Sequence, residues 1–154
     1  MDNHKKWDKR FMDLCRVVSG WSSCYRNNRQ VGAVITKNKR IIATGYNGAP
    51  AGIRSCVEKG ECMRDKLGIA SGTKAELCYG VHAEQNAIIQ AARMGIAIEG
   101  ATLYCTHRPC AICAKMIINA GIKRVVYEID YPDEFATKLF DEATIELYKY
   151  VEEK

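Results

Sequence analysis

Two short elements of the sequence carry side chains that can hold a metal ion. The first is His-Ala-Glu at 82–84, and the second is Pro-Cys-x-x-Cys at 109–113. Cysteines three apart on a helix share one face, so the thiols of Cys110 and Cys113 can reach the same ion. Pro109 is typical of a helix start, which would place Cys110 in the first turn, where the helix dipole favours the thiolate that binds metal. One histidine and two cysteines leave a tetrahedral zinc ion with one open position, the pattern of a catalytic site.

The other half of the pattern is the pair His82 and Glu84. They are only two residues apart, so a regular helix would point their side chains to different faces. The spacing makes chemical sense if His82 lies at the helix entrance and binds the metal, while Glu84 in the first turn reaches the water bound to that metal. Zinc lowers the pKa of bound water to about 7. A redox pair or two buried thiols could explain Cys110 and Cys113 alone, but not together with this upstream pair.

Together the two elements match the signature of zinc-dependent nucleobase deaminases, which combine His-x-Glu with Pro-Cys-x-x-Cys. The fitting electrophile for a zinc-bound hydroxide is the amidine-like carbon C4 of cytosine or C6 of adenine. Glu84 would take a proton from the water, protonate the neighbouring ring nitrogen and finally protonate the leaving amine. The sequence therefore predicts a hydrolase that releases ammonia.

Length and composition fit one soluble domain. The chain has 154 residues, of which 47% are hydrophobic and 27% are charged, and this is enough for one core. The net charge of +5 suits an anionic ligand but does not by itself indicate nucleic-acid binding. Residues 1–11 lack the apolar core of a signal peptide, and no stretch approaches the roughly 18 apolar residues of a membrane span. We therefore expect a cytoplasmic protein with no membrane partner, whose eight cysteines are metal ligands, catalytic groups or core residues rather than disulfides.

Helices and strands alternate along the chain, which predicts an α/β protein. We expect helices over 7–24, 83–94, 110–120 and 132–143, strands over 31–36, 40–46, 101–106 and 123–129, and a strand or helix over 145–151. The buried stripe of the first helix would consist of Phe11, Leu14, Cys15, Val18 and Trp21. Cys15 and Cys105 are expected to be core residues. The segment 53–80 is polar and weakly periodic, and a loop of this length in a compact domain indicates a function or a tether.

The sequence resembles the deoxycytidylate (dCMP) deaminase family along nearly its whole length, in particular the bacterial members with a cysteine-containing insert. The matching stretches are Val-Gly-Ala-Val at 31–34, Gly-Tyr-Asn-Gly at 45–48, His-Ala-Glu-Gln-Asn-Ala at 82–87, Gly-Ala-Thr-Leu-Tyr at 100–104, and 109–122. The resemblance implies a three-layer α/β/α sandwich with a central mixed five-stranded sheet, cytidine deaminase-like, in a single domain over 1–154. It also implies a homohexamer that hydrolyses dCMP to dUMP and supplies dUMP for thymidylate synthesis.

Related zinc deaminases differ at these positions. Free-nucleoside cytidine deaminases usually have Cys where His82 stands, and riboflavin-pathway deaminases usually have a longer gap between the two cysteines. The tRNA adenosine deaminases generally lack Gly-Tyr-Asn-Gly followed by a long cysteine-bearing insert. Two alternatives stay open: deamination of a base in tRNA or another nucleic acid, and a non-catalytic, zinc-stabilised interaction module. Lys and Arg are scattered and form no basic helix, which argues against the nucleic-acid substrate.

The resemblance implies substrate contacts outside the metal site. Asn47 would bond the deoxyribose 3′-hydroxyl or the base, and Ala83 would also contact the substrate. Arg26 and Arg29 lie just before the first predicted strand, where the family places phosphate contacts, and an arginine can bind phosphate through two hydrogen bonds at once. Either arginine could equally be solvated. Tyr131 could stack on the base or cover it, or it could belong to the core.

Four further cysteines suggest a second, structural zinc ion. Cys24 ends the first predicted helix, and Cys56, Cys62 and Cys78 lie in the segment 53–80. Zinc bound by four cysteines would supply the folding free energy that so few apolar residues cannot. The spacing is looser than that of a zinc finger, so buried or merely reduced thiols are the alternative.

The resemblance also bears on regulation. Many members of the family are activated by dCTP and inhibited by dTTP, which bind at subunit interfaces near the Gly-Tyr-Asn-Gly loop. Gly48 is therefore a candidate allosteric residue. Allostery requires two sites and two states, and one sequence shows neither.

Overall fold

One mixed sheet of five strands forms the centre of the molecule. The computed structural model describes residues 3–153, and its strands are β1 (Gly32–Lys37), β2 (Arg40–Tyr46), β3 (Thr102–His107), β4 (Arg124–Ile129) and β5 (Glu146–Lys149). Their order across the sheet is β2-β1-β3-β4-β5. Strand β1 is antiparallel to both β2 and β3, whereas β3, β4 and β5 run parallel to one another. The predicted mixed five-stranded sheet is confirmed.

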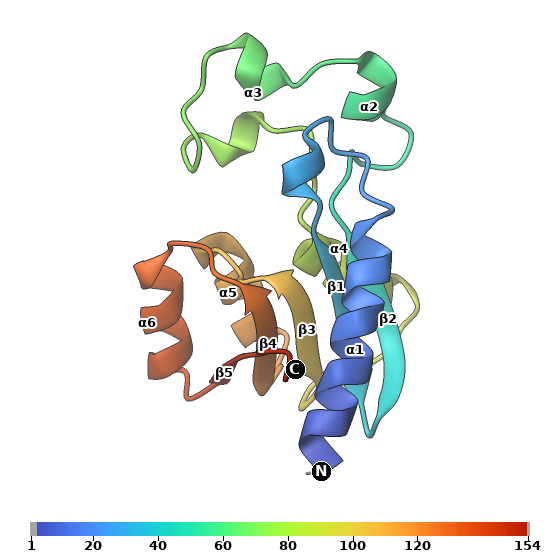
Figure 1. The fold of residues 1–154 in the computed structure, drawn as a ribbon, viewed down its shortest axis with the longest axis vertical. Coiled ribbons are helices and arrows are strands. Elements are labelled where there is room, and N and C mark those ends of the chain that lie inside the picture. The colour runs from blue at the N-terminus through green and yellow to red at the C-terminus, as the bar shows by residue number, and fades with distance from the viewer. Residues whose placement is uncertain (1–2, 154) are drawn as a thin grey trace.

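Helices cover both faces of this sheet (Figure 1). Helix α1 (Asn3–Ser19) packs on one face, and α4 (Ala83–Arg93), α5 (Ala111–Asn119) and α6 (Glu134–Glu142) pack on the other. On the α1 side, Phe11, Met12 and Cys15 meet apolar side chains of the central strands. The predicted α/β/α sandwich is therefore confirmed. None of the helices in the described part of the chain is long and apolar enough to cross a membrane.

Glycines let two of these helices approach the sheet closely. A Cβ atom at Gly32 of β1 would lie 2.2 Å from the carbonyl oxygen of Cys15 in α1. A Cβ atom at Gly45 of β2 would lie 2.2 Å from the carbonyl oxygen of Ala83 in α4. Either side chain would push its helix away from a close-packed interface. Gly45 therefore determines how closely the start of α4 can approach β2.

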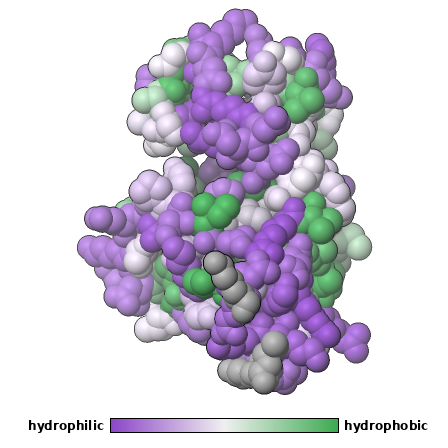
Figure 2. Space-filling view, viewed as in Figure 1, coloured by the Kyte–Doolittle hydropathy of each residue, from purple (hydrophilic) through white to green (hydrophobic). Residues whose placement is uncertain are grey.

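The segment between β2 and α4 forms a small lobe beside the sheet (Figure 1). We call residues 53–80 the insert; it contains only the short elements α2 (Cys56–Lys59), α3 (Met63–Lys66) and η2 (Ala75–Leu77). Figure 2 shows the lobe as a separate, largely hydrophilic mass, joined to the main body by a narrower waist. None of the insert residues is fully buried. Apolar packing alone therefore gives this lobe little stability.

The first helix ends earlier than predicted, and the structure decides whether the C-terminal segment is a helix or a strand. The first helix covers Asn3–Ser19 rather than 7–24 because the chain turns at Gly20. Trp21 consequently lies outside the helix, and its side chain is 58% exposed instead of belonging to the buried stripe. The C-terminal segment forms the strand β5, not a helix, because it pairs with β4. Cys15 and Cys105 are fully buried, as predicted.

Candidate functional site

The starts of two helices bring the three predicted zinc ligands together. His82 is the residue before α4, and its backbone N–H donates to Oε1 of Gln85 at 2.8 Å, which fixes the helix start. Cys110 directly precedes α5, and Cys113 lies in the first turn. Nδ1 of His82 lies 3.2 Å from Sγ of Cys113 and 3.6 Å from Sγ of Cys110. The expectation that Pro109 opens the helix is wrong by two residues, because α5 begins only after Cys110.

This cluster fits a tetrahedral zinc ion. Zinc bonds of about 2.3 Å to sulfur and about 2.0 Å to nitrogen place neighbouring donor atoms about 3.5 Å apart. The ligand atoms of His82, Cys110 and Cys113 all lie within 4.8 Å of one another. Within residues 3–153, no other three His, Cys, Asp or Glu side chains converge in this way. Three protein donors leave the fourth position of such an ion open to water or substrate.

Hydrogen bonds inside the cluster favour a thiolate at Cys110. Its sulfur accepts hydrogen bonds from Cys113 and His82, and these lower the pKa of Cys110 to about 4 although burial opposes the shift. The same bond to Cys110 raises the pKa of His82. Since the thiolate is the form that binds zinc, the cluster is already arranged to receive a cation.

Glu84 lies beside the cluster in a buried position. It is the second residue of α4, and the residue is only 5% exposed. Burial raises the pKa of its carboxyl group, and the neighbouring His82 partly counteracts this rise. The carboxyl group interacts with the thiols of Cys113 and Cys105. A buried carboxyl group with a raised pKa is suited to accept a proton and return it, as a general acid–base must.

Asp133 holds the metal-binding loop in place, a role that sequence reasoning missed. Its Oδ2 accepts a hydrogen bond from the N–H of Ala111 at 2.8 Å, and its Oδ1 accepts one from the N–H of Ala136 at 2.9 Å. One carboxylate thereby caps α5 and α6 together. Because Ala111 lies between Cys110 and Cys113, this bond helps to orient both thiols. The only signal in the sequence is an aspartate directly before a helical segment, which is typical of an N-cap.

The loop after β2 passes close to the cluster. Gly48 and Val81 exchange two backbone hydrogen bonds of 3.2 and 2.7 Å, which places Gly48 beside the residue that precedes the histidine ligand. The Asn47 side chain accepts a bond from the N–H of Val31 at 2.9 Å and donates one to the carbonyl oxygen of Arg29 at 2.7 Å. Asn47 therefore fixes the backbone before β1. Its contact with the sugar or base of a substrate stays a prediction.

Both predicted phosphate contacts reach the insert. Arg26 lies just before the short helix η1 (Asn27–Arg29) and forms an ion pair with Asp65, in which Nε donates to Oδ2 at 2.9 Å. Arg29 donates from Nη2 to Oγ of Ser71 at 2.7 Å. The alternative that both arginines are merely solvated is therefore wrong, while phosphate binding by either one stays a prediction.

Three further residues considered in the sequence lie at the ends of helices or strands that carry the site. Ala83 is the first residue of α4 and is buried. Tyr131 follows β4 and is half-buried, and its carbonyl oxygen accepts a hydrogen bond from Nε of Arg108 at 2.9 Å. Tyr131 is therefore not a core residue, which leaves open the predicted contact with a base. His107 ends β3 but does not belong to the group that could bind metal.

The four cysteines predicted to bind a second zinc gather at the base of the insert: Cys24, Cys56, Cys62 and Cys78. The pKa of Cys56 is raised first by burial and then by the charges on the other three thiols, so each of the three lies near enough to Cys56 to interact with it. The N–H of Gly80 donates to Sγ of Cys78 at 3.3 Å. However, no three of these thiols lie within 4.8 Å of one another in the described structure. The other three cysteines therefore lie near Cys56, but the four sulfur atoms do not form a tetrahedral set of zinc ligands.

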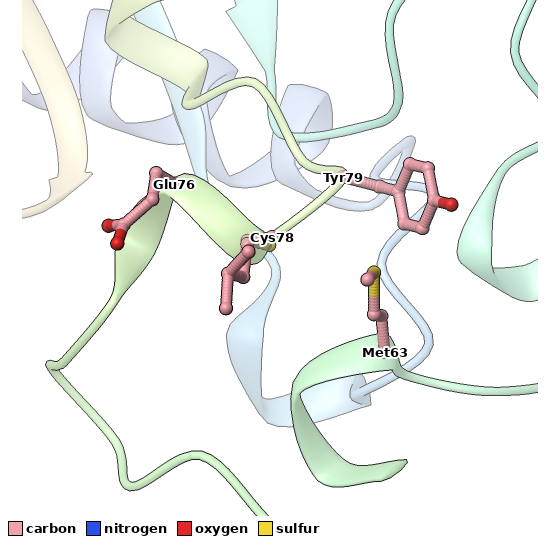
Figure 3. A pocket seen from close by; sticks show the side chains of 5 residues that line it. Met63, Glu76, Cys78 and Tyr79 are labelled. Carbon is pink, nitrogen blue, oxygen red and sulfur yellow. The ribbon is translucent and has the colours of Figure 1, made fainter. Parts of the chain in front are cut away.

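A small pocket lies next to Cys78. Its volume is about 210 Å³, and it is lined by Met63, Glu76, Leu77, Cys78 and Tyr79. Figure 3 shows the Met63 side chain pointing toward the ring of Tyr79, while Glu76 points away. Nζ of Lys59 lies 3.2 Å from the centre of the Tyr79 ring, a cation–π contact. The pocket is smaller than the roughly 300 Å³ at which ligand sites begin, so we assign it to packing within the insert.

Comparison with known proteins agrees with this site. The family model of the cytidine and deoxycytidylate deaminase zinc-binding region matches residues 5–129. The deoxycytidylate deaminase of Mycobacterium phage D29 is 40% identical over 126 residues, which cover 79% of this chain and 93% of the phage protein. The deoxycytidylate deaminase of Schizosaccharomyces pombe is 37% identical over 146 residues, which cover 94% of this chain. The chain spans only 44% of the length of that yeast relative.

A solved structure shares the fold over almost the whole length of both chains. It is the dCMP deaminase from the cyanophage S-TIM5 in complex with dCMP and dUMP, with a TM-score of 0.75 and 31% sequence identity. The similarity covers 97% of this chain and 99% of that chain. The family model includes both elements of the metal cluster as well as the insert. The chain belongs to the cytidine and deoxycytidylate deaminase zinc-binding family.

Proposed function

We propose that this protein hydrolyses dCMP to dUMP and ammonia and so supplies dUMP for thymidylate synthesis. The observation that carries the proposal is the convergence of His82, Cys110 and Cys113 beside the buried carboxyl group of Glu84. Similarity to deoxycytidylate deaminases, and to a structure solved with dCMP and dUMP, supports this substrate rather than a free base or a nucleic acid.

The residues of the site divide the proposed chemistry among them. A zinc ion held by His82, Cys110 and Cys113 would supply a water molecule whose pKa is lowered to about 7. Glu84 accepts a proton from this water and delivers it to N3 of the cytosine ring, beside the reacting C4. Glu84 then carries the second water proton to the exocyclic amine, which leaves as ammonia, and the water oxygen becomes O4 of dUMP. The buried position of Glu84 keeps bulk water from competing for these protons.

The substrate would lie against the residues that surround the cluster. Asn47 and Ala83 would contact the sugar and the base, and Tyr131 would cover the base. The 5′-phosphate would lie at the segment before β1, which carries Arg26 and Arg29. The hydrogen bond from the Asn47 side chain to the carbonyl oxygen of Arg29, 2.7 Å long, supports a shared site because it joins the proposed sugar and phosphate contacts.

An ammonia-release assay tests the proposed substrate. The panel consists of dCMP, CMP, dCTP, deoxycytidine, cytosine and a tRNA anticodon stem-loop, and we expect the highest kcat/KM with dCMP. Preference for the stem-loop would refute the proposal in favour of a nucleic-acid deaminase. No release from any member of the panel would favour the zinc-stabilised interaction module.

The role of Glu84 is tested by replacing it with Ala. General acid–base catalysis contributes about 10²–10⁴-fold to a rate, so turnover should fall by at least that factor, while the zinc content and the circular dichroism spectrum stay unchanged. The matched control is Glu142→Ala on the exposed side of α6, which should keep full activity. Normal turnover in Glu84→Ala would refute the proposed proton transfer.

A second, structural zinc is also proposed, bound by Cys24, Cys56, Cys62 and Cys78. Two observations support it: the electrostatic effect of the other three thiols on Cys56, and the N–H of Gly80 that already donates to the sulfur of Cys78. A metal tether would also explain how an insert with no fully buried residue is held to a single deaminase domain over 1–154. Metal analysis of freshly purified protein should give two zinc ions per chain, and a value of one would contradict the proposal.

Regulation by dCTP and dTTP in a homohexamer is proposed at a groove beside β2. The groove has a volume of about 710 Å³ and runs between the loop that carries Gly48 and helix α4. Arg93 offers it a positive charge, and Trp21 and Met94 are 58% and 71% exposed, an apolar surface that suits a second copy of the chain. Light scattering should show the hexamer. Activity against dCMP concentration should change with dCTP or dTTP, and hyperbolic curves that neither nucleotide affects would reject the regulation.

A cytoplasmic location completes the proposal. All eight cysteines are free thiols in the structure, which suits a reducing compartment. Cell fractionation followed by immunodetection would test it, and recovery in a membrane or exported fraction would contradict it.

A further inference from the structure

The two arginines before β1 have different kinds of partner. Arg26 faces a carboxylate: Nε donates to Oδ2 of Asp65 at 2.9 Å, and Nη2 contacts the other carboxylate oxygen. This bidentate pair uses the same edge of the guanidinium group that would bind a phosphate. A phosphate at Arg26 would also lie beside the negative charge of Asp65. The position of Arg26 is therefore suited to holding α3 of the insert.

Arg29 keeps its charge available. Its side chain donates only to the neutral hydroxyl group of Ser71, at 2.7 Å, and it forms no ion pair within residues 3–153. Arg29 is half-buried and close enough to His107 for its charge to act on that imidazole. Burial is the main cause of the lowered pKa of His107; the charge of Glu128 opposes this shift and the charge of Arg29 adds to it. His107 ends β3, three residues before Cys110. A half-buried cation near His107, with no carboxylate partner in the described part of the chain, favours an anionic ligand.

The insert reaches the same place from the other side. Ser71 lies 42 residues beyond Arg29 in the sequence, yet the two side chains are bonded. At the next residue, a Cβ atom on Gly72 would lie 3.9 Å from the hydroxyl oxygen of Tyr131. Residues 71–72 therefore lie between the segment before β1 and the segment after β4, both of which carry proposed substrate contacts.

We propose that Ser71 of the insert, together with Arg29, receives the 5′-phosphate of the substrate, whereas Arg26 holds the insert in place through Asp65. This assignment rests on the proposed nucleotide function and gives the two arginines separate tasks. When the phosphate arrives, the hydroxyl group of Ser71 turns from Arg29 to donate to a phosphate oxygen, and Arg29 donates to the same anion. Ser71 is then a specificity-determining residue that distinguishes nucleotides from nucleosides.

Paired kinetics with dCMP and deoxycytidine test the assignment, because only dCMP carries the phosphate. Ser71→Ala should lower kcat/KM for dCMP by about 10- to 100-fold, the usual effect of one hydrogen bond to a charged group, mainly through KM, and leave deoxycytidine unaffected. Arg29→Ala should do the same to a larger extent. Arg26→Ala and Asp65→Ala should resemble each other, changing kcat/KM for the two substrates by equal factors and making the insert more sensitive to protease.

Thr73→Ala is the matched control. Its hydroxyl group lies in the same turn but donates within the insert, to the carbonyl oxygen of Ala70 at 2.7 Å. The dCMP preference should survive this change. Equal losses in Ser71→Ala and Thr73→Ala, or equal effects of Ser71→Ala on both substrates, would show that Ser71 only supports the shape of the insert. A lost preference in Arg26→Ala but not in Arg29→Ala would reverse the two roles and overturn the assignment.

Calorimetry with inorganic phosphate and with dUMP separates this inference from the proposed function. Both probes should bind the unmodified protein more tightly than Ser71→Ala or Arg29→Ala, whether or not dCMP is turned over. Binding that depends on these two residues in a protein without dCMP deaminase activity would refute the proposed function and support the phosphate site. Binding that is equal in all three proteins would refute the phosphate site even if dCMP is the substrate.

Discussion

Replacing Asp133 with Ala should damage both the fold and the metal site, although this residue touches no metal ligand side chain. The change removes two hydrogen-bond acceptors, one for the N–H of Ala111 at the start of α5 and one for the N–H of Ala136 in α6. The first bond lies between the two cysteine ligands, and the second is an ordinary helix N-cap. One substitution therefore releases two helix ends that pack against each other.

The size of the effect follows from these two bonds. Loss of an N-cap costs about 0.5–2 kcal/mol, and loss of a hydrogen bond to a charged group costs about 1.5–3 kcal/mol. The free energy of unfolding should therefore fall by about 2–5 kcal/mol, which for a chain of this size lowers Tm by about 4–20 °C. Residues that orient metal ligands typically contribute about 10- to 100-fold to metal affinity, so zinc should bind more weakly by that factor.

Urea unfolding followed by circular dichroism measures the first quantity, and competition with a chromophoric zinc chelator measures the second. Asp133→Asn keeps one acceptor oxygen and should lie between Ala and the unmodified protein in both assays. The matched control is Asp141→Ala in α6, whose exposed side chain has no hydrogen bond or ion pair among the described residues. A control as unstable as Asp133→Ala would mean that the loss is unspecific.

Two results would refute this reasoning. Normal stability in Asp133→Ala would show that the two N–H groups find other partners at no cost. Reduced stability with unchanged zinc affinity would show that Asp133 holds α6 but does not orient the cysteines.

The remaining predictions concern the frame of the site and the metal itself. Asp8→Ala removes the buried carboxylate that accepts from the partly buried Arg124 at 2.7 and 2.9 Å, so urea unfolding should show a loss of about 3–5 kcal/mol. Asp13→Ala removes a half-exposed carboxylate and should lose less than about 1 kcal/mol. Equal losses in the two variants would contradict the reasoning. Gly45→Ala places a Cβ atom 2.2 Å from the carbonyl oxygen of Ala83. It should lower the free energy of unfolding by about 1–3 kcal/mol and lower the zinc content of the purified protein. An unchanged zinc content would show that α4 tolerates the shift. Removal of zinc with a strong chelator should lower Tm, and added zinc but not magnesium should restore it. If metal analysis confirms that the zinc is gone and Tm is unchanged, no zinc site contributes to folding.

The sequence alone predicted the three metal-binding side chains and the class of fold. Metal ligation depends on side-chain type and short spacing, and both are visible in His-x-Glu and Cys-x-x-Cys. Alternating helical and strand periodicity predicted the α/β sandwich, and the resemblance to a known family predicted the five-stranded sheet. Local reasoning also placed His82 at a helix entrance and Glu84 in the first turn. Side chains two residues apart in a regular helix point to different faces, so both can reach one site only if the first lies just before the helix. Trp21 was misplaced because the hydrophobic spacing continues past Gly20, where the backbone turns.

Only the tertiary structure decided which distant segments meet. The histidine and cysteine ligands lie about 30 residues apart and come together because α4 and α5 begin at the same end of the sheet. Asp133 caps α5 from the segment that follows β4, and Ser71 reaches Arg29 from within a segment that is only weakly periodic. Periodicity records which face of one element is buried, whereas these contacts depend on strand order and on how the chain crosses between layers. The metal-binding cluster could therefore be predicted from local pattern, but the different partners of Arg26 and Arg29 could not.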